Sequence, residues 1–152
     1  KLKLCLVCCE ADRKGLVPLI KYLRGHFEVC LPVFSGSAAE VREANRDILL
    51  NADLICLYYG VGDEAWKYHQ TNELTRVKAM RSRPSVPVEY VLLAEPTTDD
   101  KELLAALADS RTIDLREGIS MQVQTTLSGL LDTPVSAQRS SCLSAHAGDQ
   151  TP

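Results

Sequence analysis

Residues 51–80 read NADLICLYYGVGDEAWKYHQTNELTRVKAM. An apolar run at 54–59 stops at the glycine turn 60–62, and a helix-like segment follows it. This order predicts a buried strand, a tight turn, and a helix that begins with the carboxylates of Asp63 and Glu64. Ligands of open α/β sheets bind outside the carboxyl ends of the strands, which is where such a junction lies.

Strand and helix patterns alternate along the rest of the chain. Apolar runs predict five strands, at residues 3–8, 28–31, 54–59, 88–94 and 112–115. Apolar residues at helical spacing predict helices at 13–24, 38–50, 63–80, 99–108 and 119–131. The strands are apolar at almost every position, which is typical of strands buried on both faces of a parallel sheet. The sequence therefore predicts an α/β fold: a flavodoxin-like three-layer sandwich, with a five-stranded parallel sheet and helices on both faces.

Two helices carry specific expectations. In the helix at 13–24, Asp12 is the expected N-cap and Gly25 the expected C-terminal stop. In the helix at 99–108, the leucines are expected to point into the core, at positions Leu103, Leu104 and Leu107.

The composition is that of one globular domain. The chain has 152 residues, of which 45% are hydrophobic and 24% charged, and its net charge is -3. This mild acidity gives no reason to expect a nucleic-acid partner, and no apolar run approaches the ~18 residues of a membrane span. Residues 1–132 are predicted to form the domain. Residues 133–152 hold few apolar side chains and are predicted to be a linker or disordered tail.

Four of the six cysteines, Cys5, Cys8, Cys30 and Cys56, lie in or at the end of apolar strand-like runs. Free cysteine behaves there as a small hydrophobe, so these residues are predicted to be buried thiols. The cluster of Cys5, Cys8 and Cys9 lacks a second C-x-x-C and a nearby histidine pair, so no metal site is predicted. Reduced thiols are typical of the cytoplasm, which is the predicted location.

The loops that follow the predicted strands share one edge of such a sheet. Their acidic residues are Glu10, Asp12, Asp63, Glu64, Glu95 and Asp99. On the helix at 63–80, one face carries Trp66, Gln70, Glu73 and Val77, which are spaced i, i+4, i+7 and i+11. A carboxylate beside a flat aromatic ring can hold a nucleobase or a nicotinamide. The alternative also stays open: Asp63 and Glu64 cap the helix, Trp66 packs in the core, and Glu73 is solvated.

The span 3–131 resembles a TIR (Toll/interleukin-1 receptor) domain of the divergent bacterial type. Three motifs in order carry the resemblance: CCEADR at 8–13, EVCLPVFSG at 28–36, and ADLICLYYGVGDEAW at 52–66. TIR domains of this type are usually fused to other modules of defence and signalling proteins. The resemblance therefore implies a signalling or effector domain of a larger prokaryotic protein, which acts together with the other domains of that protein.

The resemblance implies two alternative functions. Many TIR domains cleave NAD at the nicotinamide–ribose bond, and a glutamate stabilises the oxocarbenium-like transition state. In that case NAD is the substrate, no cofactor is required, and Glu73 or Glu64 is the catalytic acid. The residues expected to contact the substrate are Cys9, Glu10, Asp12, Phe34, Ser35 and Trp66. Other TIR domains are non-catalytic scaffolds, and in both cases the loop from Pro32 to Ser37 is expected to make the self-association contacts.

The chain departs from the family pattern at the catalytic position. TIR enzymes usually carry a glutamate four residues after a Trp or similar residue, whereas Gln70, which has no charge, follows Trp66 here. Glu73 lies one helical turn further along, and Glu64 lies two residues before the tryptophan. The glutamine favours the scaffold and the surrounding carboxylates favour the enzyme. A third alternative is a nucleoside deoxyribosyltransferase-like enzyme, which shares the sandwich and a catalytic glutamate.

Overall fold

Five parallel strands form the centre of the part of the chain that the computed structural model describes, residues 2–82, 87–119 and 124. These are β1 (Lys3–Val7), β2 (Glu28–Cys30), β3 (Leu54–Tyr59), β4 (Val88–Leu93) and β5 (Thr112–Asp114). They are hydrogen-bonded in the order β2-β1-β3-β4-β5, with every neighbouring pair parallel. This is the flavodoxin-like order. The predicted fold class is confirmed, and the strand order reverses beside β1.

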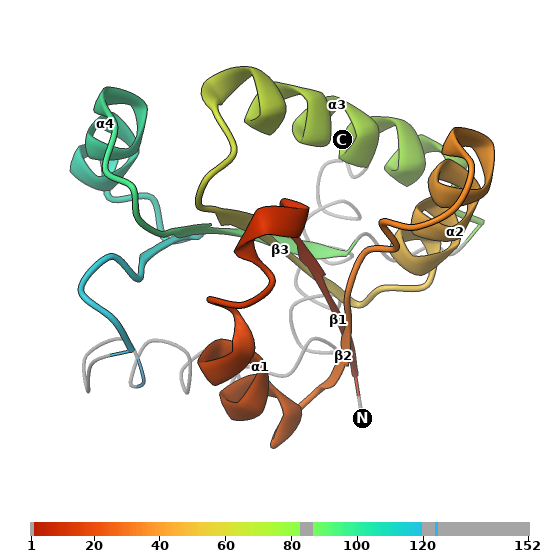
Figure 1. The fold of residues 1–152 in the computed structure, drawn as a ribbon, viewed down its shortest axis with the longest axis horizontal. Helices are drawn as coiled ribbons and strands as arrows, with labels where there is room; N and C mark the ends of the chain where they lie inside the picture. Colours follow the sequence, from red (N-terminus) through yellow and green to blue (C-terminus); the bar gives the residue numbers. More distant parts are fainter. Residues whose placement is uncertain (1, 83–86, 120–123, 125–152) are drawn as a thin grey trace, which may run out of the picture.

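The helices of the described residues are α1 (Val17–Arg24), α2 (Ala38–Leu50), α3 (Glu64–Met80) and α4 (Asp99–Leu107). Helices α2 and α3 cover one face of the sheet, and α1 covers the opposite face (Figure 1). Most observed bounds lie within a residue or two of those predicted from the sequence. The predicted helix at 119–131 and the predicted tail at 133–152 lie outside the described residues, except for positions 119 and 124.

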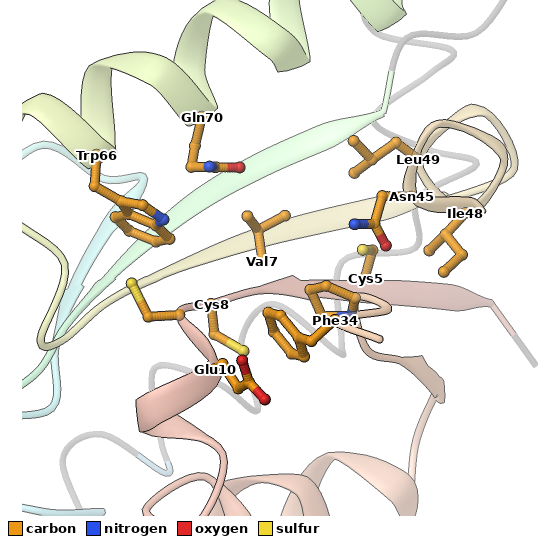
Figure 2. A pocket seen from close by; sticks show the side chains of 12 residues that line it. Cys5, Val7, Cys8, Glu10, Phe34, Asn45, Ile48, Leu49, Trp66 and Gln70 are labelled. Carbon is orange, nitrogen blue, oxygen red and sulfur yellow. The ribbon is translucent and has the colours of Figure 1, made fainter. Parts of the chain in front are cut away.

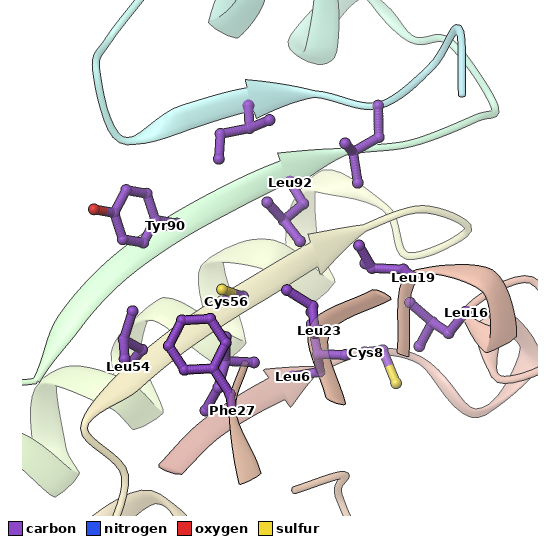
Figure 3. Packing of buried hydrophobic residues seen from close by; sticks show 13 residues of the cluster. Leu6, Cys8, Leu16, Leu19, Leu23, Phe27, Leu54, Cys56, Tyr90 and Leu92 are labelled. Atoms are coloured by element: carbon purple, nitrogen blue, oxygen red, sulfur yellow. The ribbon is translucent and has the colours of Figure 1, made fainter. Parts of the chain in front are cut away.

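Alternate residues of each central strand belong to two different hydrophobic cores. Leu6 of β1 packs with Leu19 and Leu23 of α1 in one core (Figure 3). Val7, the next residue, packs with Leu57 in the core beneath α2 and α3. Full burial of such a side chain contributes about 1.5–3 kcal/mol, so both faces of the sheet must be apolar. This two-sided burial is why the strand sequences are continuously apolar.

The start of α1 differs from the prediction. A short 3-10 helix at Glu10–Asp12 and a turn precede it, and its N-cap, Leu16, makes no side-chain hydrogen bond to the helix. The Asp12 carboxylate instead accepts hydrogen bonds from the backbone N–H of Val61. The prediction that Asp12 caps this helix is therefore wrong, whereas Gly25 is the C-cap, as predicted.

Helix α4 also differs from the prediction. Leu104 is partly buried, but Leu103 is 59% exposed and Leu107 67% exposed, so the expectation that all three point inward is wrong. Polar contacts attach this helix to the sheet instead. Lys101 is fully buried, and its Nζ donates hydrogen bonds to backbone oxygens of Gly60 and Pro96. Because the lysine faces the sheet, Leu103 and Leu107 turn toward solvent.

The described cysteines are all free. Cys5, Cys8 and Cys56 are buried, as predicted, but Cys30 is only partly buried because β2 is an edge strand, so its prediction as a buried thiol is wrong. Burial raises the pKa of Cys5 and of Cys56 to about 12, and that of Cys8 to about 11, so these thiols are neutral at physiological pH. The described residues contain no group of three or more His, Cys, Asp or Glu side chains placed to hold a metal ion. None of the helices in this part of the chain is long and apolar enough to cross a bilayer.

Candidate functional site

A pocket of about 260 Å³ lies beside the carboxyl end of β1 (Figure 2). Its walls come from β1 and the turn after it, from the loop between β2 and α2, and from helices α2 and α3. Side chains that can stack on or hydrogen-bond to a ligand come from three of these segments: Glu10, Phe34, Trp66 and Gln70. The pocket lies next to the point where the strand order reverses, which is the usual ligand site of open α/β sheets.

Helix α3 contributes Trp66 and Gln70 to the pocket. The Asp63 carboxylate accepts a hydrogen bond from the Trp66 backbone N–H at 2.8 Å, which caps the helix and fixes its first turn. Because Trp66 and Gln70 are four residues apart, they lie on one helix face, and both side chains point into the pocket (Figure 2). The pocket therefore presents a neutral amide one turn after the tryptophan.

The Trp66 ring packs directly against the glycine turn that ends β3. A Cβ atom on Gly62 would lie 2.4 Å from Trp66 Cε3 and 3.0 Å from the Sγ of Cys9. Any side chain at position 62 would displace one of these two pocket residues. The glycine at this point of the predicted turn is thus required by close approach.

Asp12 also supports this turn, although it does not line the pocket. Its carboxylate oxygens accept hydrogen bonds from Val61 N–H at 3.3 and 3.2 Å, and the residue is 8% exposed. Burial raises the pKa of Asp12, while the hydrogen bond from Val61 and the charge of Lys101 act in the opposite direction. A Cβ on Gly60 would lie 2.6 Å from this carboxylate, so that glycine is also required.

The loop from Pro32 to Ser37 forms a second wall, through Pro32 and Phe34. The Arg13 guanidinium carbon lies 5.6 Å from the centroid of the Phe34 ring, within the range of a cation–π contact. Asn45 of α2 holds the loop in place with two hydrogen bonds: Val33 N–H donates to Asn45 Oδ1 at 2.6 Å, and Asn45 Nδ2 donates to the Val33 carbonyl at 3.1 Å. The segment predicted to mediate self-association is therefore also part of the pocket wall.

The acidic residues predicted at this edge have different roles. Glu10 is the one carboxylate among the residues that line the pocket. Asp63 caps α3, and Glu95 accepts a hydrogen bond from the Thr97 hydroxyl at 3.1 Å. Glu64 and Asp99 are exposed in the first turns of their helices. The pocket itself therefore carries much less negative charge than the edge as a whole.

Four of the six predicted substrate contacts meet around this one pocket: Cys9, Glu10, Phe34 and Trp66. Two others, Asp12 and Ser35, do not line it. Burial raises the pKa of the Cys9 thiol, and the charges of Asp12 and Asp63 raise it further, so this thiol is a neutral wall of the pocket.

The two predicted catalytic acids lie on α3 but do not line the pocket. Glu64 is exposed in the first turn, two residues before Trp66. Glu73 is partly buried, and its Oε1 lies 3.0 Å from Nη1 of Arg76, one turn along the same helix. Their catalytic roles stay predictions, which an assay of nicotinamide release tests.

Asn45 is a pocket residue that sequence reasoning missed. It lies on α2 next to the apolar positions Val41, Ala44 and Ile48, on the side of the helix expected to pack in the core. The sequence signal that could have identified Asn45 is its position as a polar residue at the margin of an apolar helix face. Its partner, Val33, lies twelve residues earlier, and no local pattern predicts that contact.

A scan against protein-family models gives no match, and no curated protein matches the sequence. A similar solved structure is described as the crystal structure of the RPS4 and RRS1 TIR domain heterodimer. The match has a TM-score of 0.58 and 17% sequence identity, and it covers 88% of this chain and 96% of that chain. At this identity the similarity establishes the fold. The described chain has a divergent TIR-like fold, as the sequence resemblance implies.

Proposed function

We propose that this chain is a TIR-type signalling domain that binds the nicotinamide end of an NAD-like ligand without cleaving it, and acts by self-association. In this proposal it is a module of a larger cytoplasmic defence or signalling protein. The observation that supports it is the meeting of Cys9, Glu10, Phe34, Trp66 and Gln70 around one pocket, with an amide in the place of the expected glutamate. The similar crystal structure is a heterodimer of TIR domains, which supports association between domains as the mode of action.

The pocket side chains suit a flat heteroaromatic ring that carries an amide. Trp66 and Phe34 supply aromatic faces on which such a ring stacks. The side-chain amide of Gln70 combines two N–H donors with a carbonyl acceptor, which is the complement of a carboxamide. The amide of Asn45 is held by Val33 and shapes the wall instead. A volume of about 260 Å³ is near the lower end of ligand pockets. It therefore holds one ring and part of its sugar rather than a whole dinucleotide.

Gln70 is the reason to expect binding without turnover. Cleavage of the nicotinamide–ribose bond develops positive charge on the ribose, which a nearby carboxylate stabilises. A unit charge pair about 4 Å apart is worth about 4 kcal/mol at an effective dielectric constant near 20. Loss of that attraction corresponds to a rate lower by about 10³. A neutral amide at position 70 therefore favours a bound and uncleaved ligand.

A second candidate function is NAD hydrolysis, which the pocket carboxylate of Glu10 favours. In this alternative Glu10, or one of the predicted acids Glu64 and Glu73, stabilises the ribosyl cation. The two candidates differ in one measurable product, free nicotinamide.

Binding and turnover are measured on the same protein. Trp66 is the one tryptophan in the sequence, so its fluorescence reports directly on the pocket. We expect NAD to quench this fluorescence saturably, with no nicotinamide released even at high protein concentration with a crowding agent. Gln70→Glu should bind NAD and gain measurable nicotinamide release, because it places a carboxylate beside the bound ring.

Variants Glu10→Gln, Glu64→Ala and Glu73→Ala distinguish the alternatives. Nicotinamide release by the unmodified chain that one of these variants abolishes would establish the enzyme and identify its acid. Absence of saturable NAD binding, with self-association intact, would leave a scaffold without a ligand. Self-association is measured by light scattering, and Val33→Asp, at a position 37% exposed in the loop, should weaken it.

A further inference from the structure

The peptide group between Gly60 and Val61 is held on both sides by charged side chains. The Nζ of Lys101 donates a hydrogen bond to the Gly60 carbonyl at 2.6 Å. The Val61 N–H donates to the two oxygens of the Asp12 carboxylate at 3.2 and 3.3 Å. The acceptor and the donor of one peptide group are thus occupied by opposite charges, which fixes the orientation of its plane.

Lys101 is an unusual residue for a purely structural contact. It has no exposed surface, its Nζ makes a second hydrogen bond to Pro96 O at 2.5 Å, and it lies 4.8 Å from the centroid of the Tyr59 ring. Burial lowers the pKa of Lys101, and the charges of Asp12 and Glu95 oppose this shift. An apolar side chain of the same length would fill this space but leave both carbonyl oxygens without their donor. The contribution specific to the ammonium is therefore these two hydrogen bonds.

The held peptide directly precedes the residue that packs against the pocket wall. Gly62 follows it and makes the close approach to the Trp66 ring and to Cys9 Sγ. Asp63 comes next and caps α3 at the Trp66 N–H. A rotation of the Gly60–Val61 peptide would move Gly62, and Trp66 would lose the surface against which it packs.

We propose that Lys101 is a positioning residue for the pocket, acting through the Gly60–Val61 peptide to place Trp66 and Cys9 for an NAD-like ligand. This inference deepens the proposed function and rests on it for the identity of the ligand. The ammonium orients the carbonyl side of the peptide, and Asp12 orients its N–H side. Neither side chain lines the pocket.

The test uses Lys101→Met, which keeps the length of the side chain and removes the ammonium. We expect the folded variant to show red-shifted Trp66 emission, stronger acrylamide quenching, and NAD binding weaker by about tenfold. The matched control is Asp100→Asn on the same helix turn. The Asp100 carboxylate accepts hydrogen bonds from Tyr59 OH at 2.7 Å and from Lys67 Nζ at 2.6 Å, without touching the held peptide. This control should loosen α4 and leave Trp66 emission and NAD affinity unchanged.

Unchanged Trp66 emission in folded Lys101→Met, or an equal change in both variants, would overturn the proposal and leave Lys101 with a structural role only. If Lys101→Met does not fold, hydrogen exchange of the Val61 amide in the unmodified chain tests whether the Gly60–Val61 peptide is held. This amide should be protected although the residue is 52% exposed. Exchange at the rate of a free loop amide would show that the Gly60–Val61 peptide is not held, and would refute the proposal. If the unmodified chain does not bind NAD, the proposed ligand fails, while the emission comparison still tests the positioning role.

Discussion

Replacing Gly62 by alanine should push Trp66 away from the pocket wall and destabilise the domain. The added Cβ would lie 2.4 Å from Cε3 and 2.6 Å from Cδ2 of the Trp66 ring, and 3.0 Å from Cys9 Sγ. Carbon atoms in contact prefer about 3.5–4.0 Å, so the methyl group overlaps the ring by about 1 Å. The ring belongs to the first turn of α3, which Asp63 fixes, so it cannot yield without leaving the pocket.

Two opposing effects set the magnitude. Overpacking of this kind typically costs about 1–3 kcal/mol. Alanine also restricts the unfolded chain, which stabilises the folded state by about 0.4–1 kcal/mol where the backbone accepts a side chain. The net expectation for Gly62→Ala is a free energy of unfolding lower by about 1–2 kcal/mol.

The assay is urea-induced unfolding followed by far-UV circular dichroism, with Gly15→Ala as the matched control. A Cβ at Gly15 would meet nothing closer than Asp12 O at 3.6 Å, which is ordinary contact, so the control should be neutral or slightly stabilised. In the double variant Gly62→Ala/Trp66→Leu the smaller side chain removes the overlap. The two substitutions should therefore couple by about 1 kcal/mol in the favourable direction. Equal midpoints for the two alanine variants, or strict additivity in the double variant, would refute the reasoning.

Three other changes have defined expectations. Asn45→Ala removes both hydrogen bonds to Val33 and should lower the free energy of unfolding by about 1–3 kcal/mol, with faster hydrogen exchange of the Val33 amide; unchanged exchange would contradict it. Burial raises the pKa of Cys56 from 9.0 to about 12, so stability should be complete below pH 9 and fall as pH rises toward 12. For this thiol the free energy of unfolding should fall by about 1.4 kcal/mol at pH 10. Urea unfolding at pH 7.5 and 10 measures the difference, which should be smaller in Cys56→Ala. Leu107→Ala should change stability by less than about 0.5 kcal/mol, whereas Leu92→Ala in the core should cost about 2–5 kcal/mol, as measured by thermal unfolding.

The sheet was predictable because its determinants are local in sequence. Both faces of each central strand are buried, so continuous apolar runs such as 54–59 identify buried parallel strands directly. The pairing of Trp66 with Gln70 was predictable for the same reason, since helical spacing alone places both on one face. What these patterns share is that every residue needed for the inference lies within one element.

The errors arose where one polar side chain reaches another element. Lys101 lies in the first turn of α4, where a sequence pattern predicts a solvated charge, yet its acceptors are carbonyls of Gly60 and Pro96. Once the lysine faces the sheet, Leu103 and Leu107 must face solvent, although their spacing is typical of a core-facing helix. Asp12 was misjudged in the same way, because its partner is 49 residues away. Long-range hydrogen bonds of this kind can outweigh the apolar spacing of a helix, and that spacing does not predict them.

The position of charge within the pocket links these observations to function. Gln70 lies one turn after Trp66 on α3, whereas Glu10 lies on the short 3-10 helix that follows β1 (Figure 2). A ring stacked on Trp66 would thus meet the amide of Gln70 on the same helix, while the carboxylate of Glu10 belongs to the wall formed by the turn after β1. Stabilisation of a ribosyl cation requires a negative charge close to the bond that breaks, and Coulomb attraction weakens with distance. Gln70 is neutral at the position one turn after Trp66 where a carboxylate would act in cleavage, so Gln70→Glu is the substitution that should introduce that chemistry.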